Sequence, residues 1–172
     1  VCRLYPGELT ILAARPSMGK TTVGLSVAMA AARAGEGVLF FSLEMSAGQL
    51  VKRMLSAVTE VPLGKITKGQ LADHEIVQIH QRMSKLASAS IFIDDQAALN
   101  IFELRAKCRR LKQKHNLGMV IIDYLQLMQG DGGKGGGNRE QEIASISRAL
   151  KNLAKELNVP VIALSQLSRA VE

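Results

Sequence analysis

Aromatic residues are scarce in this sequence: Phe and Tyr together make up 3% of the 172 residues, and Trp is absent. Proteins that hold single-stranded nucleic acid by base stacking need aromatic platforms, so any nucleic-acid contact is expected to rest on phosphates. The two cysteines, Cys2 and Cys108, lack metal-ligand spacing, which argues against a disulfide framework and favours a reducing cytosol. No apolar run approaches the ~20 residues of a membrane span, and no signal-peptide pattern occurs. We therefore expect a cytoplasmic protein without a membrane partner.

Basic residues outnumber acidic ones by 22 to 15, which gives a net charge of +7 at pH 7. Such an excess favours polyanionic partners, nucleic acid among them. A chain of this length with 47% hydrophobic residues predicts one domain with a proper core. Because the chain begins at Val1, we expect it to be a domain of a longer protein.

Strand and helix signals alternate along the chain. Strands are expected at 9–13, 38–43, 90–93, 119–122 and 159–164, and helices at 19–34, 46–58, 73–87, 100–115 and from Asn138 onward. Several strands are continuously apolar, as strands are when helices cover both faces of a parallel sheet. The sequence therefore predicts an α/β protein of three layers whose ligands bind at the carboxyl ends of the strands.

Residues 14–21, Ala-Arg-Pro-Ser-Met-Gly-Lys-Thr, form a phosphate-binding loop pattern in which Ala14 replaces the usual first glycine. Backbone N–H groups of such a loop point at phosphate oxygens, and the helix that follows adds its positive dipole end. Gly19 permits close backbone approach, Lys20 reaches the β- and γ-phosphates, and the Thr21 hydroxyl can ligate Mg²⁺. The alternative is an ordinary strand-to-helix turn that carries Gly-Lys-Thr, which the surrounding strand and helix signals disfavour.

Three polar side chains are expected at the carboxyl ends of other strands. Asp123 follows the strand 119–122 and, beside a phosphate loop, is expected to anchor Mg²⁺ through water; the alternative is a carboxylate that satisfies turn amides. Glu44 can polarise a water that attacks the γ-phosphate, or it can serve as a carboxylate at the start of the next helix. Gln166, just past the last strand, can sense the γ-phosphate or lie in a surface turn.

Five segments occur in a characteristic order: Ala-Arg-Pro-Ser-Met-Gly-Lys-Thr, Phe-Ser-Leu-Glu-Met-Ser, Ile-Ile-Asp-Tyr-Leu-Gln-Leu-Met, Asn-Arg-Glu-Gln-Glu-Ile and Ala-Leu-Ser-Gln-Leu-Ser-Arg. Together they resemble the ATPase domain of bacterial replicative DNA helicases of the DnaB type, which belong to the RecA-like superfamily. The resemblance runs over nearly the whole chain, and the alanine at position 14 is common in that family.

The resemblance implies a three-layer RecA-like P-loop ATPase that uses ATP and Mg²⁺. It implies that the nucleotide is bound by Ala14, Arg15, Pro16, Ser17, Met18, Gly19, Lys20, Thr21, Thr22 and Arg53. By the same resemblance Glu44 is the catalytic base, Asp123 the Walker B acid and Gln166 the sensor of the γ-phosphate, with Lys20 also acting in catalysis. Arg53 would lie near the base of the nucleotide; the alternative is an exposed charge on a helix.

Two basic segments bear on DNA. The glycine-rich stretch 130–137 cannot pack a core, and in RecA-like hexamers the loop at this place faces the central channel. Lys134 and Arg139 are therefore candidate contacts with single-stranded DNA, unless the stretch is a flexible connector with an incidental lysine. The basic helix 100–115 favours a solvated face or a subunit surface over a DNA groove.

The resemblance further implies a homo-hexamer that unwinds DNA 5′→3′ in the bacterial replisome, with primase and a helicase loader as partners. Residues 1–172 would be the motor domain without the amino-terminal primase-interacting domain or the downstream basic finger. Alone, we expect them to bind nucleotide but hydrolyse it poorly. Three alternatives stay open: another RecA-like ATPase such as a recombinase or clock-type ATPase, a small-molecule P-loop kinase, and a nucleotide-gated assembly module without turnover.

Overall fold

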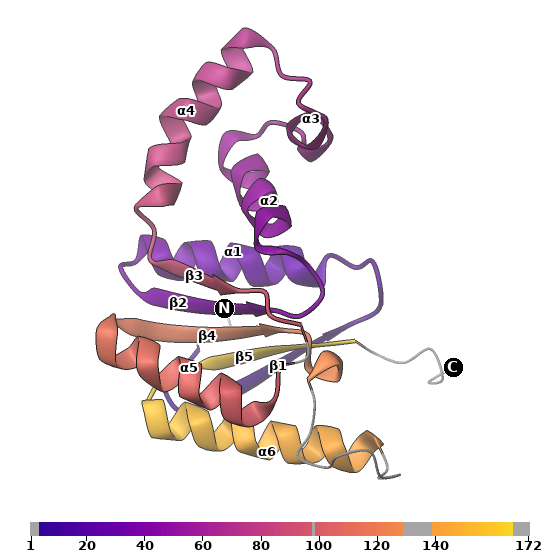
Figure 1. Ribbon diagram of the computed structural model, residues 1–172, viewed down its shortest axis with the longest axis vertical. Helices are drawn as coiled ribbons and strands as arrows, with labels where there is room; N and C mark the ends of the chain where they lie inside the picture. The colour runs from indigo at the N-terminus through magenta and orange to yellow at the C-terminus, as the bar shows by residue number, and fades with distance from the viewer. Residues whose placement is uncertain (1–3, 98, 129–138, 167–172) are drawn as a thin grey trace.

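A computed structural model describes residues 4–97, 99–128 and 139–166 (Figure 1). Its elements are β1 (Leu9–Ala14), α1 (Lys20–Arg33), β2 (Gly37–Ser42), α2 (Ala47–Thr59), α3 (Leu63–Lys68), α4 (Asp73–Ala87), β3 (Ile91–Asp94), α5 (Ile101–Lys114), β4 (Leu117–Asp123), the 3₁₀ turn η1 (Leu125–Leu127), α6 (Arg139–Leu157) and β5 (Val161–Gln166). The described strands pair in parallel in the order β1-β5-β4-β2-β3. The predicted α/β architecture is confirmed.

Helices cover both faces of the sheet, with α1 on one side and α5 and α6 on the other (Figure 1). Side chains alternate between the two faces along β2, as they do along any strand. Val38 and Phe40 pack in the cluster beneath α1, whereas Leu39 and Phe41 pack in the cluster beneath α5 and α6. The side chains on both faces of the sheet are apolar because helices bury both faces. This explains why the strands are continuous apolar runs in the sequence.

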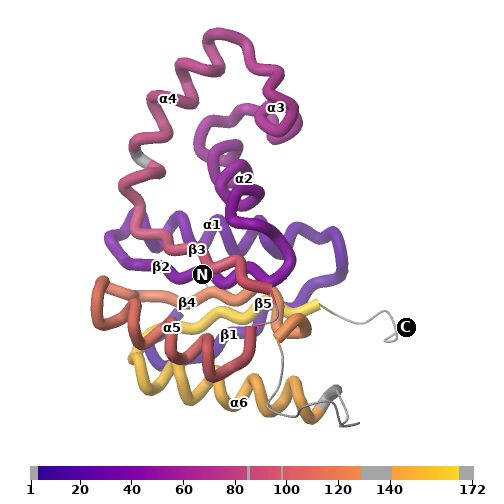
Figure 2. The backbone as a smooth tube through the Cα atoms, in the orientation of Figure 1, coloured from indigo at the N-terminus to yellow at the C-terminus, as the bar shows by residue number. Residues whose placement is uncertain are grey.

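Helices α2, α3 and α4 extend away from the sheet beyond α1 (Figure 2). Helix α4 has its predicted bounds, but two of its periodic apolar residues are exposed, Ile76 at 41% and Met83 at 43%. The helix is tied to the end of α2 instead. The Gln78 side chain donates to the Thr59 carbonyl at 2.7 Å, and Arg82 donates to the Val58 carbonyl at 2.8 Å. Helical periodicity therefore predicted the bounds of this helix correctly. It did not predict which side of the helix packs against the rest of the protein.

The carboxyl end of β5 corrects one predicted boundary. Gln166 was expected just past the last strand, but it is the final residue of β5. It belongs to the strand because β1 pairs with β5 as far as the partners Ala14 and Gln166.

The predicted cap of α5 is confirmed: Asn100 accepts a hydrogen bond from the Glu103 N–H at 2.9 Å. The expected helix cap at Asn138 lies outside the described residues. Among the described helices, none is both long and apolar enough to span a bilayer.

Candidate nucleotide-binding site

The loop between β1 and α1 has the predicted strand–loop–helix setting. Gly19 stands at the amino end of α1 with φ 78° and ψ 22°, in the left-handed region that favours glycine. Its carbonyl accepts the Val23 N–H at 3.0 Å, which closes the first helical turn. The loop therefore presents the free N–H groups of a helix start beside Lys20 and Thr21, an arrangement suited to anions.

This loop forms one wall of a cavity of about 410 Å³. The cavity is lined by Ala14, Arg15, Pro16, Ser17, Gly19, Lys20, Thr21, Thr22, Glu44, Met45, Arg53 and Gln166. The structure thus brings together predicted residues from the ends of β1, β2 and β5 and from α2. Met18 does not line the cavity, and its side chain is 71% exposed. Among the predicted nucleotide contacts, Met18 is therefore the one that does not line the cavity.

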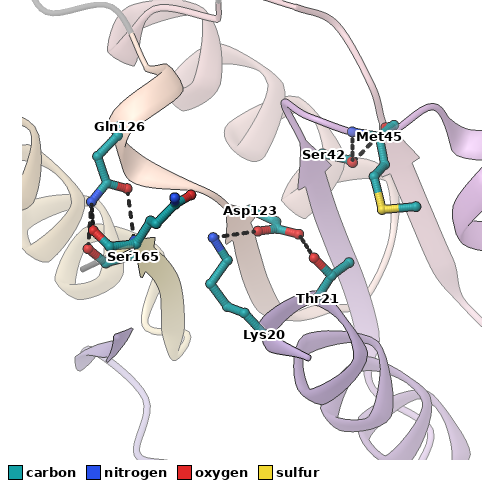
Figure 3. Close-up of polar contacts among 8 residues, drawn as sticks. Lys20, Thr21, Ser42, Met45, Asp123, Gln126 and Ser165 are labelled. Carbon is teal, nitrogen blue, oxygen red and sulfur yellow. Dashed lines mark hydrogen bonds and ion pairs between the residues drawn. The ribbon is translucent and has the colours of Figure 1, made fainter. Parts of the chain in front are cut away.

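Asp123, only 1% exposed, ends β4 and contacts two residues that line the cavity (Figure 3). Its Oδ2 accepts a hydrogen bond from the Thr21 hydroxyl at 2.5 Å, and the Lys20 ammonium stands 3.5 Å from its Oδ1. Oδ1 is buried without a hydrogen-bond partner among the described residues. Buried carboxylate oxygens are rarely left so. A carboxylate and a hydroxyl are oxygen donors of the kind Mg²⁺ prefers, so these residues fit a magnesium ion.

Tyr124 is a neighbour of Lys20 that was not singled out from the sequence. The Lys20 ammonium lies 3.9 Å from the centroid of its ring, within the range of a cation–π interaction. Burial raises the pKa of the Tyr124 hydroxyl, and the Glu44 and Asp123 carboxylates raise it further. The ring therefore stays neutral at physiological pH and lies beside the reactive groups. Its sequence signals are its place directly after Asp123 and its membership in the segment Ile-Ile-Asp-Tyr-Leu-Gln-Leu-Met.

Glu44 is held in a turn that a buried hydroxyl closes. Ser42, 1% exposed at the end of β2, donates to the Met45 carbonyl at 2.6 Å and accepts from the Met45 N–H at 3.3 Å. The start of α2 is capped by Ser46, which forms a reciprocal capping box with Gln49. Glu44 is thus not the residue that caps this helix; it is exposed and faces the cavity.

Gln166 lines the same cavity from the end of β5. Its backbone is bound by the side chain of Gln126 from η1, a residue that sequence reasoning did not identify. Gln126 lies three residues after Asp123, the last residue of β4, within the segment Ile-Ile-Asp-Tyr-Leu-Gln-Leu-Met that carries the resemblance, but nothing in that segment indicates this contact. Only the three-dimensional proximity of η1 to β5 reveals the contact.

Three basic side chains of helix α5 form ion pairs with acidic residues of the same chain. Arg105 and Arg109 both bind the Glu156 carboxylate of α6, at 3.0 and 2.5 Å, and Lys107 binds Asp94 at 2.5 Å. These three charges are therefore paired within the chain, and the assignment of this helix to a solvated face or a subunit surface stays a prediction.

The predicted DNA contacts fall beyond what can be described. Lys134 and the glycine-rich stretch 130–137 lie outside the described residues, and for Arg139 only the backbone, at the start of α6, is described. Their contact with DNA stays a prediction.

Together, the phosphate loop, the buried acid at the end of a neighbouring strand and the parallel sheet define a P-loop protein that binds a nucleoside triphosphate. More specifically, the chain belongs to the DnaB-like helicase C-terminal domain family, whose sequence profile matches residues 3–172. The predicted resemblance is confirmed.

Several replicative DNA helicases are similar to the chain along most of its length. It is 51% identical to the replicative DNA helicase DnaB of Geobacillus stearothermophilus over 166 residues, which is 96% of this chain and 36% of that protein. It is 55% identical to the DnaB of Rhodothermus marinus, covering 96% of this chain and 18% of that protein. The chain therefore spans about a third or less of the length of these relatives.

Solved structures of similar proteins have the same fold. A DnaB-like replicative helicase, described together with its interactions with primase, superposes with a TM-score of 0.91 at 34% identity, covering 98% of this chain and 41% of that one. A second solved structure, described as an ATPase domain, gives the same TM-score and identity, covering 97% of this chain and 60% of that one. The predicted RecA-like architecture is confirmed by these matches.

Proposed function

We propose that this chain is the ATP-driven motor domain of a hexameric replicative helicase, which couples ATP hydrolysis to translocation on single-stranded DNA and to unwinding at the fork. The observation that carries the proposal is the contact of Asp123 with Thr21 and Lys20, which line one cavity together with Glu44 and Gln166. Lys20 and Thr21 open α1 after the loop that follows β1, whereas Asp123, Glu44 and Gln166 lie at or just after the ends of β4, β2 and β5. Family membership supplies the class of motor.

Lys20 and the N–H groups at the start of α1 would bind the β- and γ-phosphates of ATP. The Lys20 ammonium lines the cavity beside Asp123 and the Tyr124 ring. Arg53 lines the cavity from α2 and would contact the nucleotide away from the γ-phosphate. Thr21 and Asp123 would hold Mg²⁺, the latter through water, and the ion neutralises phosphate charge when bound.

Glu44 would act as the general base. Its carboxylate accepts a proton from a water molecule whose oxygen forms a bond to the γ-phosphorus, while the bond from that phosphorus to the β–γ bridging oxygen breaks. The products are ADP and inorganic phosphate. Gln166 at the end of β5 would sense the γ-phosphate, and its loss would be passed to segments that contact DNA.

The partners follow from the proposed motor. We infer that the intact protein forms a homo-hexamer on single-stranded DNA in the bacterial cytoplasm and moves 5′→3′. A solved relative is described with its interactions with primase, and we propose primase and a helicase loader as partners here too. Lys134 and Arg139 are the proposed DNA contacts of this chain.

Strand displacement by the full-length protein tests the proposal. Labelled forks with only a 5′ tail or only a 3′ tail are offered with ATP and Mg²⁺. We expect unwinding of the 5′-tailed fork, its abolition by Lys20→Ala, and normal unwinding by Lys68→Ala, which removes a lysine on α3 outside the cavity. ATP hydrolysis without unwinding of either fork would contradict a helicase, and binding without hydrolysis would indicate an assembly module.

A further inference from the structure

The pairing between β4 and β5 stops before the end of β5. The last partners in register are Asp123 and Leu164, after which β4 gives way to η1. On its other side, β5 stays paired with β1 as far as Gln166. Among the described strands, Ser165 and Gln166 therefore have a partner on one side only, the side of β1, although Gln166 lines the cavity.

The side chain of Gln126 takes the place of the missing strand. Its Oε1 accepts the Gln166 N–H at 3.2 Å, and its Nε2 donates to the Gln166 carbonyl at 2.9 Å and to the Ser165 hydroxyl at 2.8 Å (Figure 3). A primary carboxamide has the donor and acceptor of a peptide group, so it can satisfy both backbone groups of one residue. Gln126 thus fixes the Gln166 peptide much as a neighbouring strand would.

We propose that Gln126 is a positioning residue that holds Gln166 at the γ-phosphate side of the cavity. This inference rests on the sensor role proposed for Gln166. Gln126 does not line the cavity itself, so it acts through the backbone that it binds. The segment from Asp123 to Gln126 therefore carries both the buried acid beneath the phosphate loop and the group that fixes the sensor strand.

The rate of an enzyme depends steeply on the position of the groups around the reacting atoms, because a misplacement of about 1 Å can lower the rate roughly 100-fold. Loss of the carboxamide would release the Gln166 peptide on one side while leaving Lys20, Thr21 and their contacts with Asp123 in place. The expected signature is a lower kcat at an unchanged KM for ATP.

The test compares Gln126→Met with Gln166→Ala and with the double variant in the full-length protein, by steady-state ATPase assays with DNA. Methionine keeps the length of the side chain but removes its hydrogen bonds. We expect kcat to fall about 10-fold or more with KM for ATP within twofold, and Gln126→Met to have no further effect when Gln166 is already alanine. The matched control is Gln78→Met, which removes a 2.7 Å bond from a glutamine side chain to a backbone carbonyl far from the cavity. It should leave kcat unchanged.

Hydrogen exchange at the Gln166 amide supplies a readout that does not need turnover. We expect faster exchange in Gln126→Met and unchanged exchange in Gln78→Met. Normal exchange at Gln166, a normal kcat, or an equal loss of kcat in the Gln166→Ala background would each overturn the positioning role. A Gln166→Ala variant that hydrolyses ATP normally would instead overturn the sensor role in the proposed function, even where the exchange result holds.

Discussion

The Thr21 hydroxyl donates a 2.5 Å hydrogen bond to Oδ2 of Asp123, a residue 102 positions further along the chain. One residue belongs to the first turn of α1 and the other ends β4, so the contact exists only when the sheet has formed. It places the two oxygen groups suited to Mg²⁺ side by side beneath the phosphate loop.

Replacing Asp123 by asparagine is expected to weaken the effect of Mg²⁺ on nucleotide binding. An amide lacks the negative charge that holds a cation and its waters, so we expect about a 10–100-fold loss in Mg²⁺ affinity. Titration of a fluorescent nucleotide with and without Mg²⁺ measures it. Asp73→Asn, at the start of α4, serves as the control and should behave as wild type. Equal Mg²⁺ enhancement in both variants would remove Asp123 from the metal site.

Replacing Glu44 by glutamine should abolish hydrolysis while nucleotide binding is retained. Glutamine keeps the shape but cannot accept the proton of the attacking water, and the loss of a general base costs about 10²–10⁴-fold in rate. Phosphate release and nucleotide affinity are measured on the full-length protein, with Glu103→Gln on α5 for comparison. Turnover by Glu44→Gln at more than a tenth of the wild-type rate would assign the base to another group.

The Tyr124 ring should contribute to nucleotide affinity through Lys20. Tyr124→Phe keeps a ring beneath the ammonium and should bind nucleotide normally, whereas Tyr124→Leu removes the ring. A cation–π contact of ~0.5–1 kcal/mol corresponds to a loss of roughly 2–5-fold in affinity. Calorimetric titration with ADP and Mg²⁺ distinguishes the two variants, and equal affinities would show that the ring only fills space.

Substitution by alanine should change the stability of the fold in opposite directions at two glycines. A Cβ at Gly37, the first residue of β2, would overlap the Asn116 backbone carbonyl, whereas a Cβ at Gly48 in α2 has nothing within 4 Å. We expect Gly37→Ala to destabilise the fold by about 1–3 kcal/mol and Gly48→Ala to stabilise it by about 0.5–1 kcal/mol. Urea unfolding of both variants measures the difference, and a neutral Gly37→Ala would mean that the strand shifts at little cost.

The pH dependence of stability should include Glu156. Hydrogen bonds from Arg109 and Arg105 lower the pKa of this carboxyl below its ordinary value of 4.5. A lowered pKa in the folded state stabilises the protein above the ordinary pKa, and this stabilisation is lost as pH falls through the folded value. Glu156→Gln should therefore lower the free energy of unfolding at pH 7 by about 1 kcal/mol or less, which thermal unfolding would show as a slightly lower Tm. The difference in stability between wild type and Glu156→Gln should shrink as pH falls below about 4.5, and it should also shrink in high salt. A difference independent of pH would contradict the ion pair.

The sequence predicts the part of the site that local patterns encode. Gly19, Lys20 and Thr21 follow a strand and open a helix, and Asp123 and Glu44 follow apolar strands, so parallel pairing alone brings their ends to one edge. The role of Gln126 could not be predicted in this way. It depends on where the β4–β5 pairing ends, and strand register is set by the whole sheet rather than by neighbouring residues.

Helix α4 illustrates the same limit for the fold. Its periodicity identified its bounds, but Ile76 and Met83 remain exposed because the helix is tied to the end of α2 through Gln78 and Arg82. Periodicity reports that a helix has an apolar side, not which surface that side meets. Similarly, pairing with β1 includes Gln166 in β5, although the apolar run ends earlier.

The 3.5 Å contact between Lys20 and Asp123 links the two proposed ligands of the site thermodynamically. Phosphate competes with Asp123 for the ammonium, and a metal ion competes with Lys20 for the carboxylate. Each ligand therefore removes a competitor of the other, so each should raise the affinity of the other by the same factor. We therefore expect the ion pair to make the proposed site favour a metal–nucleotide complex over either component alone.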